Sequence, residues 1–431
     1  MKRKKGEYFI GMTYGSSANR KYSKRKRERL RQLYLRRALI VSICVVLLAG
    51  IGALAYFCIV PSVSKLFVVN NKPASADEAP SKVIATTAQK EDAKPDITPA
   101  TQAPTEAPTE APEEKPEKPA VDTYVTPVIA DDDKDGTLFS STLYLYNNKG
   151  FNLFGSTDKV AKNYATAVND LANKLDKKVT VYNMVIPNHT EFGLPQRISA
   201  AIGCTSQADN LKQISGYLAD RITSINAYNV LAQHNDEYLY YNTDHHWTSL
   251  GAYYAYTAFC AQTGQTPIEL SALEANSISG FTGSFYSLTS SSALKNNADT
   301  VVYYTMPHNT SATMTERMGS STISCGMYYP AATGGSLTYG VFCWGDTANF
   351  VIKSDVGTGK KIAVVKDSYG NAFAPYLTAN YDEVHLIDYR YYKGNLNDYL
   401  KSKGITEVIF VNNTMSANSA SQVTAMKNAL S

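Results

Sequence analysis

The alternation of strands and helices near the C-terminus is the feature that most constrains how this chain folds. Three short apolar runs have the length and character of buried strands: 361–366, 383–388 and 407–411. A segment with helical character follows each of them: 372–379, 396–403 and 421–430. This order predicts an α/β fold in which helices flank a parallel sheet. Ligands of such sheets bind beyond the carboxyl ends of the strands, so the residues there are the first candidates for a site.

Polar residues stand at two of these strand ends. Asp367 and Ser368 follow the first strand on a tight turn, and Asn412 and Asn413 follow the third. A serine on a sharp strand-to-helix turn is exposed, and its backbone N–H can point at an oxyanion. An Asp-Ser pair before a helix is also a common helix cap, so a catalytic interpretation needs a partner elsewhere in the chain.

The string Asp244-His245-His246-Trp247 supplies that partner. It places an acid, two of the chain's six histidines and one of its two tryptophans in four consecutive residues. Such side chains are rarely buried without partners. The string follows a short predicted strand at 237–241 and precedes a predicted helix over 248–262, capped by Thr248 or Ser249. It therefore lies on a strand-to-helix turn, where α/β proteins commonly carry active-site residues.

The two strings together predict nucleophilic catalysis. A serine hydroxyl needs a base to become a nucleophile, and His246 is the candidate base for Ser368. Asp244 lies two residues before His246, so an extended backbone projects both to one face, where Asp244 can orient the imidazole. Asn413 or Asn412 can offer a side-chain N–H to an oxyanion at the same edge of the sheet.

Metal binding is the alternative use of Asp244, His245 and His246. A hydrolytic metal site draws further ligands from elsewhere, and no matching cluster of histidines and acids stands out in the sequence. Residues 131–136 (DDDKDG) begin like a calcium loop, but Thr142 stands at the twelfth position instead of a bidentate glutamate. We interpret that segment as a solvated turn, with calcium as the lesser alternative, and expect neither a metal nor another cofactor.

The remainder of the domain beyond residue 130 shows weaker patterns. Strands are predicted at 142–146 and 178–186. Helices are predicted at 157–176 and 207–226. Residues 265–345 are rich in Ser, Thr, Gly and Tyr, with short β-like runs at 300–304 and 337–342. We interpret 265–345 as a β-rich insertion packed beside the sheet. Its tyrosines suit sugar binding, but ordinary β-structure explains them equally well.

The N-terminal part predicts a membrane anchor. Residues 1–37 carry 14 Lys or Arg and two acids, whereas the remaining residues carry 28 basic and 36 acidic ones. Residues 38–60 form a run of 23 residues without a charge, long enough to cross a hydrocarbon core of roughly 20 residues. The basic flank places the N-terminus in the cytoplasm and explains the basic run without nucleic-acid binding. A signal peptide cleaved near residues 53–55 is the competing interpretation, but the apolar run continues past that point.

Residues 61–130 predict a disordered spacer. The stretch 71–130 holds 10 of the 17 prolines and no aromatic residue before Tyr124. Such a composition buries too little apolar surface to offset its ordering entropy, so it stays extended. The sequence therefore predicts a single-pass membrane protein whose domain at 131–431 lies outside the cell.

Cysteine usage predicts no disulfide scaffold. Four cysteines lie in the outer domain: Cys204, Cys260, Cys325 and Cys343. They are too few for a disulfide framework and lack zinc-ligand spacing. One or two bridges are compatible with the sequence, which does not select their pairing.

The two strings together resemble the DHHW protein family of Gram-positive bacteria. The resemblance rests on Asp244-His245-His246-Trp247, followed by 248–254 (TSLGAYY), and on 366–371 (KDSYGN), and it covers most of 135–415. That family is similar to the SGNH-hydrolase-like domains of alginate O-acetylation proteins, in which an Asp-x-His element precedes a Gly-Asp-Ser element. Lys366 stands here where the wider group has glycine.

The resemblance implies an SGNH-hydrolase-like fold and a role for each catalytic residue. Ser368 becomes the nucleophile, His246 the base and Asp244 its orienting acid. Asn413 takes the place of the hydrolases' third-block asparagine, with Asn412 beside it.

Three further residues are expected around the site. Arg390, just past the strand at 383–388, stands where a residue lining the site is expected. His245 and Trp247 are expected to have structural roles and to form walls that face the substrate, and not to act as catalysts.

The resemblance also implies a function and partners. The expected reaction is acetyl transfer through a Ser368 acyl-enzyme onto a hydroxyl of a surface polysaccharide or wall polymer. Such proteins often work beside a membrane-bound O-acyltransferase that exports acyl groups. A carbohydrate esterase is one alternative, because the same triad serves water and sugar hydroxyls alike. A non-catalytic glycan-binding protein of the cell envelope is the other.

Overall fold

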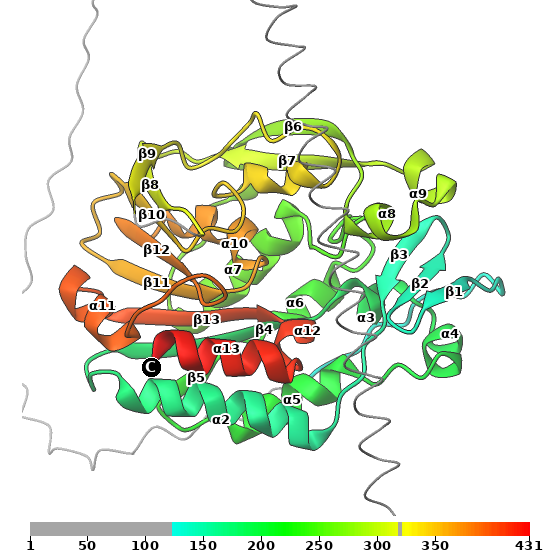
Figure 1. Cartoon of the computed structure of the whole chain (residues 1–431), viewed down its shortest axis with the longest axis horizontal. Coiled ribbons are helices and arrows are strands. Elements are labelled where there is room, and N and C mark those ends of the chain that lie inside the picture. Colours follow the sequence, from blue (N-terminus) through cyan, green and yellow to red (C-terminus); the bar gives the residue numbers. More distant parts are fainter. Residues whose placement is uncertain (1–122, 318–320) are drawn as a thin grey trace, which may run out of the picture. The chain divides into compact units, whose positions relative to one another are not determined.

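The computed structural model describes residues 123–317 and 321–431 (Figure 1). The predicted cytoplasmic tail at 1–37, the predicted membrane helix at 38–60 and most of the predicted spacer at 61–130 lie outside these residues. Within 123–317 and 321–431, no helix is long and apolar enough to cross a bilayer. The described residues form an α/β fold with a mixed, mostly parallel sheet flanked by helices, which confirms the predicted fold class at this level.

An eight-stranded sheet forms the centre of the fold. Its strands are β4 (Thr180–Ile186), β5 (Ile222–Ser224), β8 (Thr310–Thr315), β9 (Thr322–Cys325), β10 (Asn349–Ser354), β11 (Lys361–Lys366), β12 (Glu383–Asp388) and β13 (Glu407–Asn413). The strand order is β5-β4-β13-β11-β12-β10-β8-β9. The strands from β5 to β12 in that order run parallel, whereas β10, β8 and β9 continue the sheet antiparallel.

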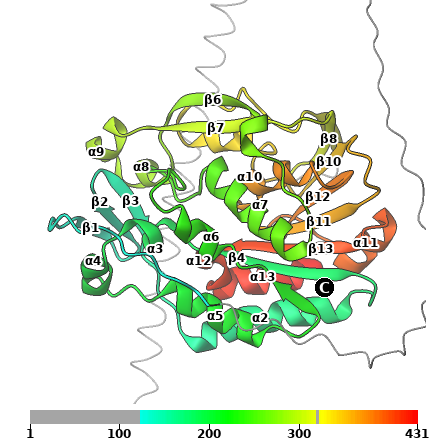
Figure 2. The same cartoon turned by 180° about the vertical axis from the view of Figure 1, so that it is seen from behind.

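Helices cover both faces of the sheet. They are α2 (Asp158–Lys174), α3 (His189–Gly193), α4 (Gln196–Ala201), α5 (Gln207–Tyr217), α6 (Tyr228–Gln233), α7 (Ser249–Thr263), α8 (Ser284–Thr289), α9 (Ser292–Asn296), α10 (Gly370–Leu377), α11 (Leu396–Lys403), α12 (Thr414–Ala417) and α13 (Ala420–Leu430). Figures 1 and 2 show α2, α5 and α13 on one face and α7 and α10 on the other. Strands covered on both faces need apolar residues throughout, which is why β11, β12 and β13 read as unbroken apolar runs.

Two smaller sheets lie beside the main one. The first contains β1 (Thr137–Ser140), β2 (Leu143–Tyr146) and β3 (Lys149–Asn152), and the second contains β6 (Glu274–Phe281) and β7 (Asp299–Thr305). Two 3₁₀ helices, η1 (Leu270–Ala272) and η2 (Gly335–Val341), complete the described elements. Most of the predicted insertion at 265–345 thus stands beside the sheet, but its strands β8 and β9 extend the sheet itself.

The helix predicted over 207–226 is too long. It ends at Tyr217, because the side chain of Asn169 donates to the Tyr217 carbonyl oxygen and accepts from the Ala219 N–H. Those two bonds replace the next helical hydrogen bonds, and the chain continues into β5.

Two of the predicted strands are absent. The segment 237–241 makes only one isolated bridge, between Tyr240 and Trp247, because the chain turns back on itself directly after it. The segment 337–342 lies mostly within η2. Gly334 and Gly335 both have positive φ before η2, which turns the backbone out of an extended path.

The four cysteines among the described residues form no disulfide, and the acidic turn at 131–136 is compensated by an arginine. Cys204, Cys260, Cys325 and Cys343 are all free thiols. In the turn at 131–136, Arg197 pairs with Asp131 and Asp135, so a cation from the protein itself compensates these acids.

Candidate active site

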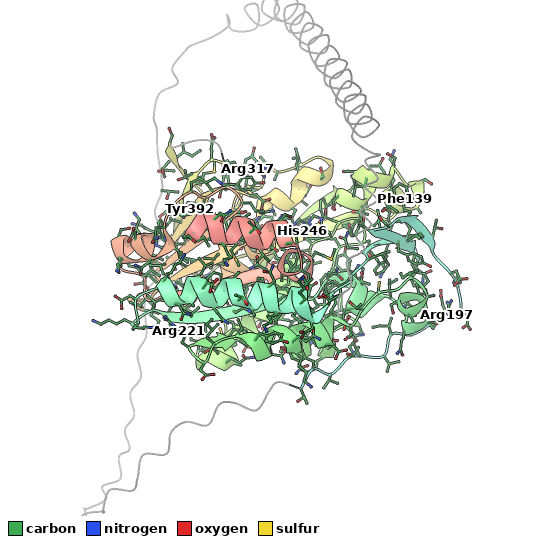
Figure 3. All side chains as sticks on the ribbon, turned by 60° about the horizontal axis from the view of Figure 1, so that its bottom comes forward. Phe139, Arg197, Arg221, His246, Arg317 and Tyr392 are labelled. Atoms are coloured by element: carbon green, nitrogen blue, oxygen red, sulfur yellow. The ribbon has the colours of Figure 1, made fainter. Side chains whose placement is uncertain are left out.

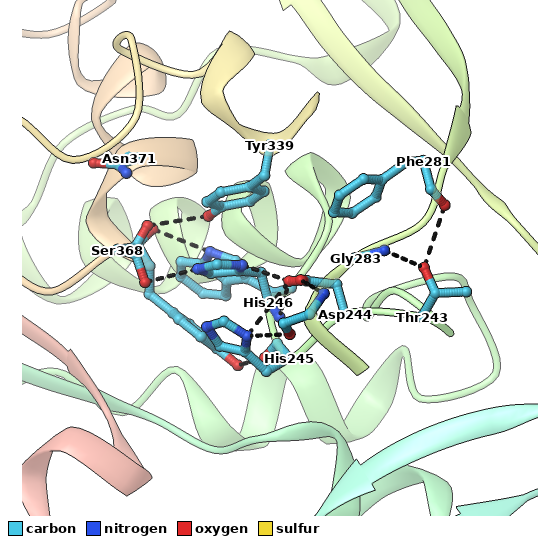
Figure 4. Close-up of polar contacts among 12 residues, drawn as sticks. Thr243, Asp244, His245, His246, Phe281, Gly283, Tyr339, Ser368 and Asn371 are labelled. Carbon is cyan, nitrogen blue, oxygen red and sulfur yellow. Dashed lines mark hydrogen bonds and ion pairs between the residues drawn. The ribbon is translucent and has the colours of Figure 1, made fainter. Parts of the chain in front are cut away.

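Ser368, His246 and Asp244 form a continuous line of hydrogen bonds (Figure 4). Nε2 of His246 lies 2.7 Å from Oγ of Ser368, and Nδ1 of His246 lies 2.5 Å from Oδ1 of Asp244. All three side chains are buried, although Ser368 and His246 border a cavity. Two segments separated by more than a hundred residues therefore bring together the three residues that the sequence predicts as nucleophile, base and orienting acid.

The turn after β11 presents Ser368 at the carboxyl edge of the sheet. The Asp367 carboxylate accepts from the Tyr369 N–H at 2.9 Å and from the Asn413 N–H at 2.8 Å. These bonds tie the ends of β11 and β13 together, so the position of the serine is set by the parallel sheet. Burial raises the pKa of Asp367.

A second carboxylate holds the turn that carries Asp244. Asp299, the first residue of β7, accepts from the backbone N–H groups of Asn242 and Thr243, each at 2.8 Å, and from the Thr243 hydroxyl at 2.5 Å. Asp244 Oδ2 then accepts from the Ser284 N–H at 2.7 Å. The segment between β6 and β7 therefore fixes the acid of the triad from outside the main sheet.

The surroundings of Asp244 keep it ionised. Burial opposes ionisation of this carboxyl, but His245, His246 and its hydrogen bonds outweigh burial, and its pKa lies well below the usual value. An ionised Asp244 can hold the Nδ1 proton of His246 and stabilise the imidazolium that forms during proton transfer.

The imidazole of His246 lies between two other rings. The ring of Tyr339 stacks on it at a centroid distance of 3.8 Å and an interplanar angle of 9°, and the ring of His245 lies 3.9 Å away on the other side (Figure 4). The Tyr339 hydroxyl also donates to the backbone oxygen of Ser368 at 3.1 Å. Tyr339, which the sequence did not indicate, therefore contacts both the base and the nucleophile residue.

His245 has a structural partner of its own. Its Nδ1 lies 2.7 Å from the hydroxyl of Ser284, and its backbone oxygen accepts from the Tyr369 hydroxyl at 2.5 Å. Burial and the neighbouring His246 lower the pKa of His245 to about 4. A neutral His245 supports the ring of His246 and is outside the set of residues that line the cavity.

Trp247 is a core residue and not a wall that faces substrate. Its side chain is fully buried, and its indole N–H donates to the backbone oxygen of Tyr369 at 3.1 Å. Its burial agrees with the expected structural role, but Trp247 does not line the cavity, where it was expected to form a wall that faces the substrate.

The predicted asparagines do not line the cavity. Asn413 caps α12 by accepting from the Ser416 N–H at 3.0 Å, and Asn412 donates to the Tyr164 hydroxyl at 3.1 Å. Asn371 lies beside Ser368 instead, with Nδ2 3.1 Å from Asp346. Its place in the KDSYGN string was the sequence signal, but the string assigned it no role.

Arg390 and Lys366 belong to a group of four charges beneath the cavity. Arg390 contacts Asp388 at 2.6 Å and Asp346 at 2.9 Å, and the buried Lys366 contacts Asp388 at 2.9 Å. Arg390 is therefore behind the cavity and not in its lining. A side chain on Gly370 would overlap Lys366, so the lysine in place of the wider group's glycine is packed tightly under the serine turn.

The two cations of this group, Lys366 and Arg390, act on Asp346, which does line the cavity. Burial opposes its ionisation, but Lys366, Arg390 and His246 together hold its pKa well below the usual value. The cavity therefore contains a second carboxylate near His246 that the sequence did not indicate.

Asp244, His245 and His246 could also offer ligand atoms to a metal. Their candidate atoms lie within 4.8 Å of one another. Both ring nitrogens of His246 already bond to Asp244 and Ser368, so a metal there would break the triad. The arrangement suits proton transfer better than metal binding.

A cavity of about 370 Å³ opens onto the triad, within the range of about 300–1,000 Å³ that is usual for ligand sites. Ser368, His246 and Asn371 border it on one side, and residues between 329 and 346 form most of the remaining wall. The backbone N–H of Ser368 and the side-chain N–H of Asn371 are the candidate donors to an oxyanion beside Ser368.

Comparisons with known proteins identify one family and several similar solved structures. The family model described as DHHW protein matches residues 112–387. A DHHW family protein from Eubacterium siraeum is 30% identical, with a TM-score of 0.63, and the match covers 69% of this chain and 100% of that one. PatB1 of Bacillus cereus, solved with a sulfonyl adduct, is 20% identical with a TM-score of 0.55. The match covers 67% of this chain and 100% of PatB1. The O-acetyltransferase domain of Pseudomonas putida AlgJ is 12% identical with a TM-score of 0.37. The match covers 68% of this chain and 99% of the AlgJ domain. No curated protein sequence matches the chain.

Proposed function

This chain belongs to the DHHW family, and we propose that its outer domain is a serine-dependent O-acetyltransferase that acts on a cell-surface polysaccharide or wall polymer. The observation that carries the proposal is the hydrogen-bonded line from Asp244 through His246 to Ser368 at the edge of a cavity. The two strings resemble the DHHW family, and the similarity of that family to alginate O-acetylation proteins supports acetyl transfer as the reaction. The shared fold with PatB1 supports the arrangement of the domain.

The first half-reaction acetylates the serine. Ser368 Oγ attacks the carbonyl carbon of an acetyl donor while its proton passes to His246 Nε2, 2.7 Å away. The Ser368 N–H and the side chain of Asn371 stabilise the oxyanion of the tetrahedral intermediate. When the bond to the donor breaks, the leaving group takes the proton from His246, and the acetyl group remains as an ester on Ser368.

The second half-reaction moves the acetyl group to the acceptor. A sugar hydroxyl loses its proton to His246 Nε2 as its oxygen attacks the acetyl carbon. The bond to Ser368 Oγ then breaks, and Oγ regains the proton from His246. Asp244 stabilises the imidazolium in both halves because it stays ionised.

The proposed location follows from the N-terminal sequence. The run at 38–60 would anchor the chain, and the proline-rich residues of 61–130 would hold the domain outside the membrane. A membrane-bound O-acyltransferase that delivers acetyl groups is the proposed partner. Protease added to intact cells should degrade 131–431 and spare 1–37, whereas a protected domain would contradict this topology.

The reaction can be tested with purified full-length chain. We expect an activated acetyl ester to acetylate Ser368, and the acetyl group to move to an oligosaccharide when one is present, as measured by mass spectrometry of both. Ser368→Ala should abolish both products. Acetate release that is unaffected by the oligosaccharide would indicate an esterase instead. If no acetyl group is found on Ser368 of the wild-type protein, the acetyltransferase proposal is contradicted, and the non-catalytic glycan-binding protein becomes the better interpretation.

A further inference from the structure

One connection forms most of the wall that faces the triad. Of the sixteen residues that line the cavity, eleven lie between 329 and 346, in the connection from β9 to β10. The catalytic strings contribute Asp244, His246, Ser368 and Asn371. What reaches the acetylated serine is therefore decided by a segment that carries none of the triad.

Two aromatic rings form a stacked pair in this wall. The rings of Tyr329 and Trp344 lie 4.2 Å apart at an angle of 22°. The indole N–H of Trp344 donates to the Gly326 carbonyl oxygen at 2.9 Å, which fixes the orientation of the ring. Tyr329 is 37% exposed, and Leu337 beside it in the wall is 69% exposed. The pair is thus a rigid aromatic surface that solvent reaches.

The backbone holds Trp344 in an unfavourable conformation. Cys343 and Trp344 have φ values of 50° and 60°, although neither is glycine. The Cys343 thiol donates to the backbone oxygen of Asn371 at 3.5 Å, so this strained turn is attached to the segment that carries Ser368. Strain of this kind persists where surrounding contacts impose it, and it clusters at functional sites.

The chemistry of the wall fits a sugar ring. A pyranose has a flat face of C–H groups that packs on an aromatic ring, and a rim of hydroxyls that needs polar partners. The wall offers the aromatic pair together with the hydroxyls of Thr333 and Ser336 and the carboxylate of Asp346. An acetyl group has two carbons and needs none of this surface, so the wall suits the acceptor better than the acyl group of the donor.

We propose that Tyr329 and Trp344 form the acceptor subsite, where they stack on a pyranose ring and direct its hydroxyl toward the acetyl group on Ser368. This rests on the proposed acetyltransferase function. A ring bound there would also displace water from the triad, which is what separates transfer from hydrolysis.

The first test measures binding without catalysis. The chain has two tryptophans, and Trp247 is fully buried, so a fluorescence change on sugar binding reports Trp344. Full-length Ser368→Ala protein is titrated with three β-1,4-linked pentasaccharides: cellopentaose, penta-N-acetylchitopentaose and pentamannuronate. We expect at least one to change the fluorescence and Tyr329→Ala to weaken its binding about ten-fold. No change with any of the three would overturn the subsite, whether or not the chain is an acetyltransferase.

The second test measures acceptor choice during turnover. The bound pentasaccharide competes with glycerol, which has no ring, for the acetyl group on Ser368. Tyr329→Ala should lower the ratio of sugar product to glycerol product about ten-fold, whereas Tyr329→Phe should keep it within about two-fold because it retains the ring face. Phe139→Ala removes an aromatic residue that is 48% exposed on β1, away from Arg317 at the cavity rim (Figure 3), and should leave the ratio unchanged.

These outcomes separate the two proposals. An unchanged product ratio in Tyr329→Ala, with normal acetylation of Ser368 and an unchanged Tm, would overturn the subsite and leave the acetyltransferase intact. Failure of wild-type protein to acetylate Ser368 would overturn the acetyltransferase, while the fluorescence titration would still decide whether the aromatic pair binds sugar.

Discussion

His246 is fixed by contacts at its edge and on both ring faces. Asp244 and Ser368 bond its two nitrogens, and the rings of His245 and Tyr339 lie against its faces. The hydrogen bonds set which nitrogen holds the proton, and the stacked rings resist rotation of the imidazole. A base held this way needs little reorganisation when the proton moves.

Removing the charge of Asp244 should leave the fold intact but impair proton transfer. Asp244→Asn keeps the shape of the side chain, but it cannot stabilise an imidazolium. We expect kcat for acetyl transfer to fall roughly 10⁴-fold, as the same change does in another Ser-His-Asp site, with a much smaller change in KM. Steady-state kinetics measure this, and a loss below ten-fold would mean that Asp244 is not part of the proton-transfer line.

Two substitutions separate the ring of Tyr339 from its hydroxyl. Tyr339→Phe keeps the stacked face and loses one hydrogen bond, so we expect a stability loss of about 1 kcal/mol and kcat within about three-fold of wild type. Tyr339→Leu loses the face, and kcat should fall about ten-fold because His246 can rotate. Urea unfolding and kinetics of both variants check this. Equal kcat in the two variants would show that stacking does not position the base.

At the level of the elements, the candidate active site joins the main sheet to a segment beside it. The sheet presents Ser368 at the end of β11, whereas the connection after β6 and the first residue of β7 hold the turn that carries Asp244. The sequence could predict the residues of both halves, but not the contacts that hold them. Apolar runs and a polar pair at a strand end locate Ser368, and the string Asp244-His245-His246-Trp247 makes it a candidate nucleophile.

The residues that sequence missed come from connections without such periodicity. Tyr339 lies in η2, which was predicted as a strand, and Asp346 follows a turn of three residues with positive φ. The residues next to Tyr339 and Asp346 in the sequence give no signal that these two side chains lie near His246, roughly a hundred residues earlier. Asn412 and Asn413 illustrate the opposite case, because they stand at the expected strand end but their hydrogen bonds hold the fold together.

Gly283, in the connection between β6 and β7, lies in close contact with the Asp244 side chain. A Cβ on this residue would overlap the Asp244 side chain, so Gly283→Ala should displace Asp244 and lower kcat by at least about 100-fold. Gly216→Ala is the matched control, because nothing lies within 4 Å of its added Cβ in α5. We expect the control to keep full activity and to gain up to about 1 kcal/mol of stability. Wild-type kcat in Gly283→Ala would contradict the role of this segment.

At the level of the whole molecule, three histidines with lowered pKa values make stability depend on pH. Burial is the main cause that lowers the pKa of His189 to about 3 and those of His245 and His385 to about 4, from 6.5. Between pH 6.5 and about 4, the unfolded chain binds protons that the folded chain does not. The free energy of unfolding therefore falls as pH falls through this window.

This dependence can be measured as a shift in Tm. We expect Tm to fall between pH 7 and pH 4.5, and to fall less in His189→Phe, whose ring can pack between Phe151 and Tyr240 as the imidazole does. A Tm that is constant or higher at pH 4.5 would contradict the assignment of these histidines as neutral in the folded state.

The proposed reaction requires Ser368 to be an activated nucleophile, and covalent labelling tests this most directly. Sulfonyl fluorides react with activated serines, and PatB1, which shares this fold, has been solved with a sulfonyl adduct. Full-length protein treated with phenylmethylsulfonyl fluoride should gain one sulfonyl group, located on Ser368 by peptide mass spectrometry, and His246→Gln should react at least about 100-fold more slowly. Label on another residue, or equal labelling rates in wild type and His246→Gln, would contradict the catalytic assignment.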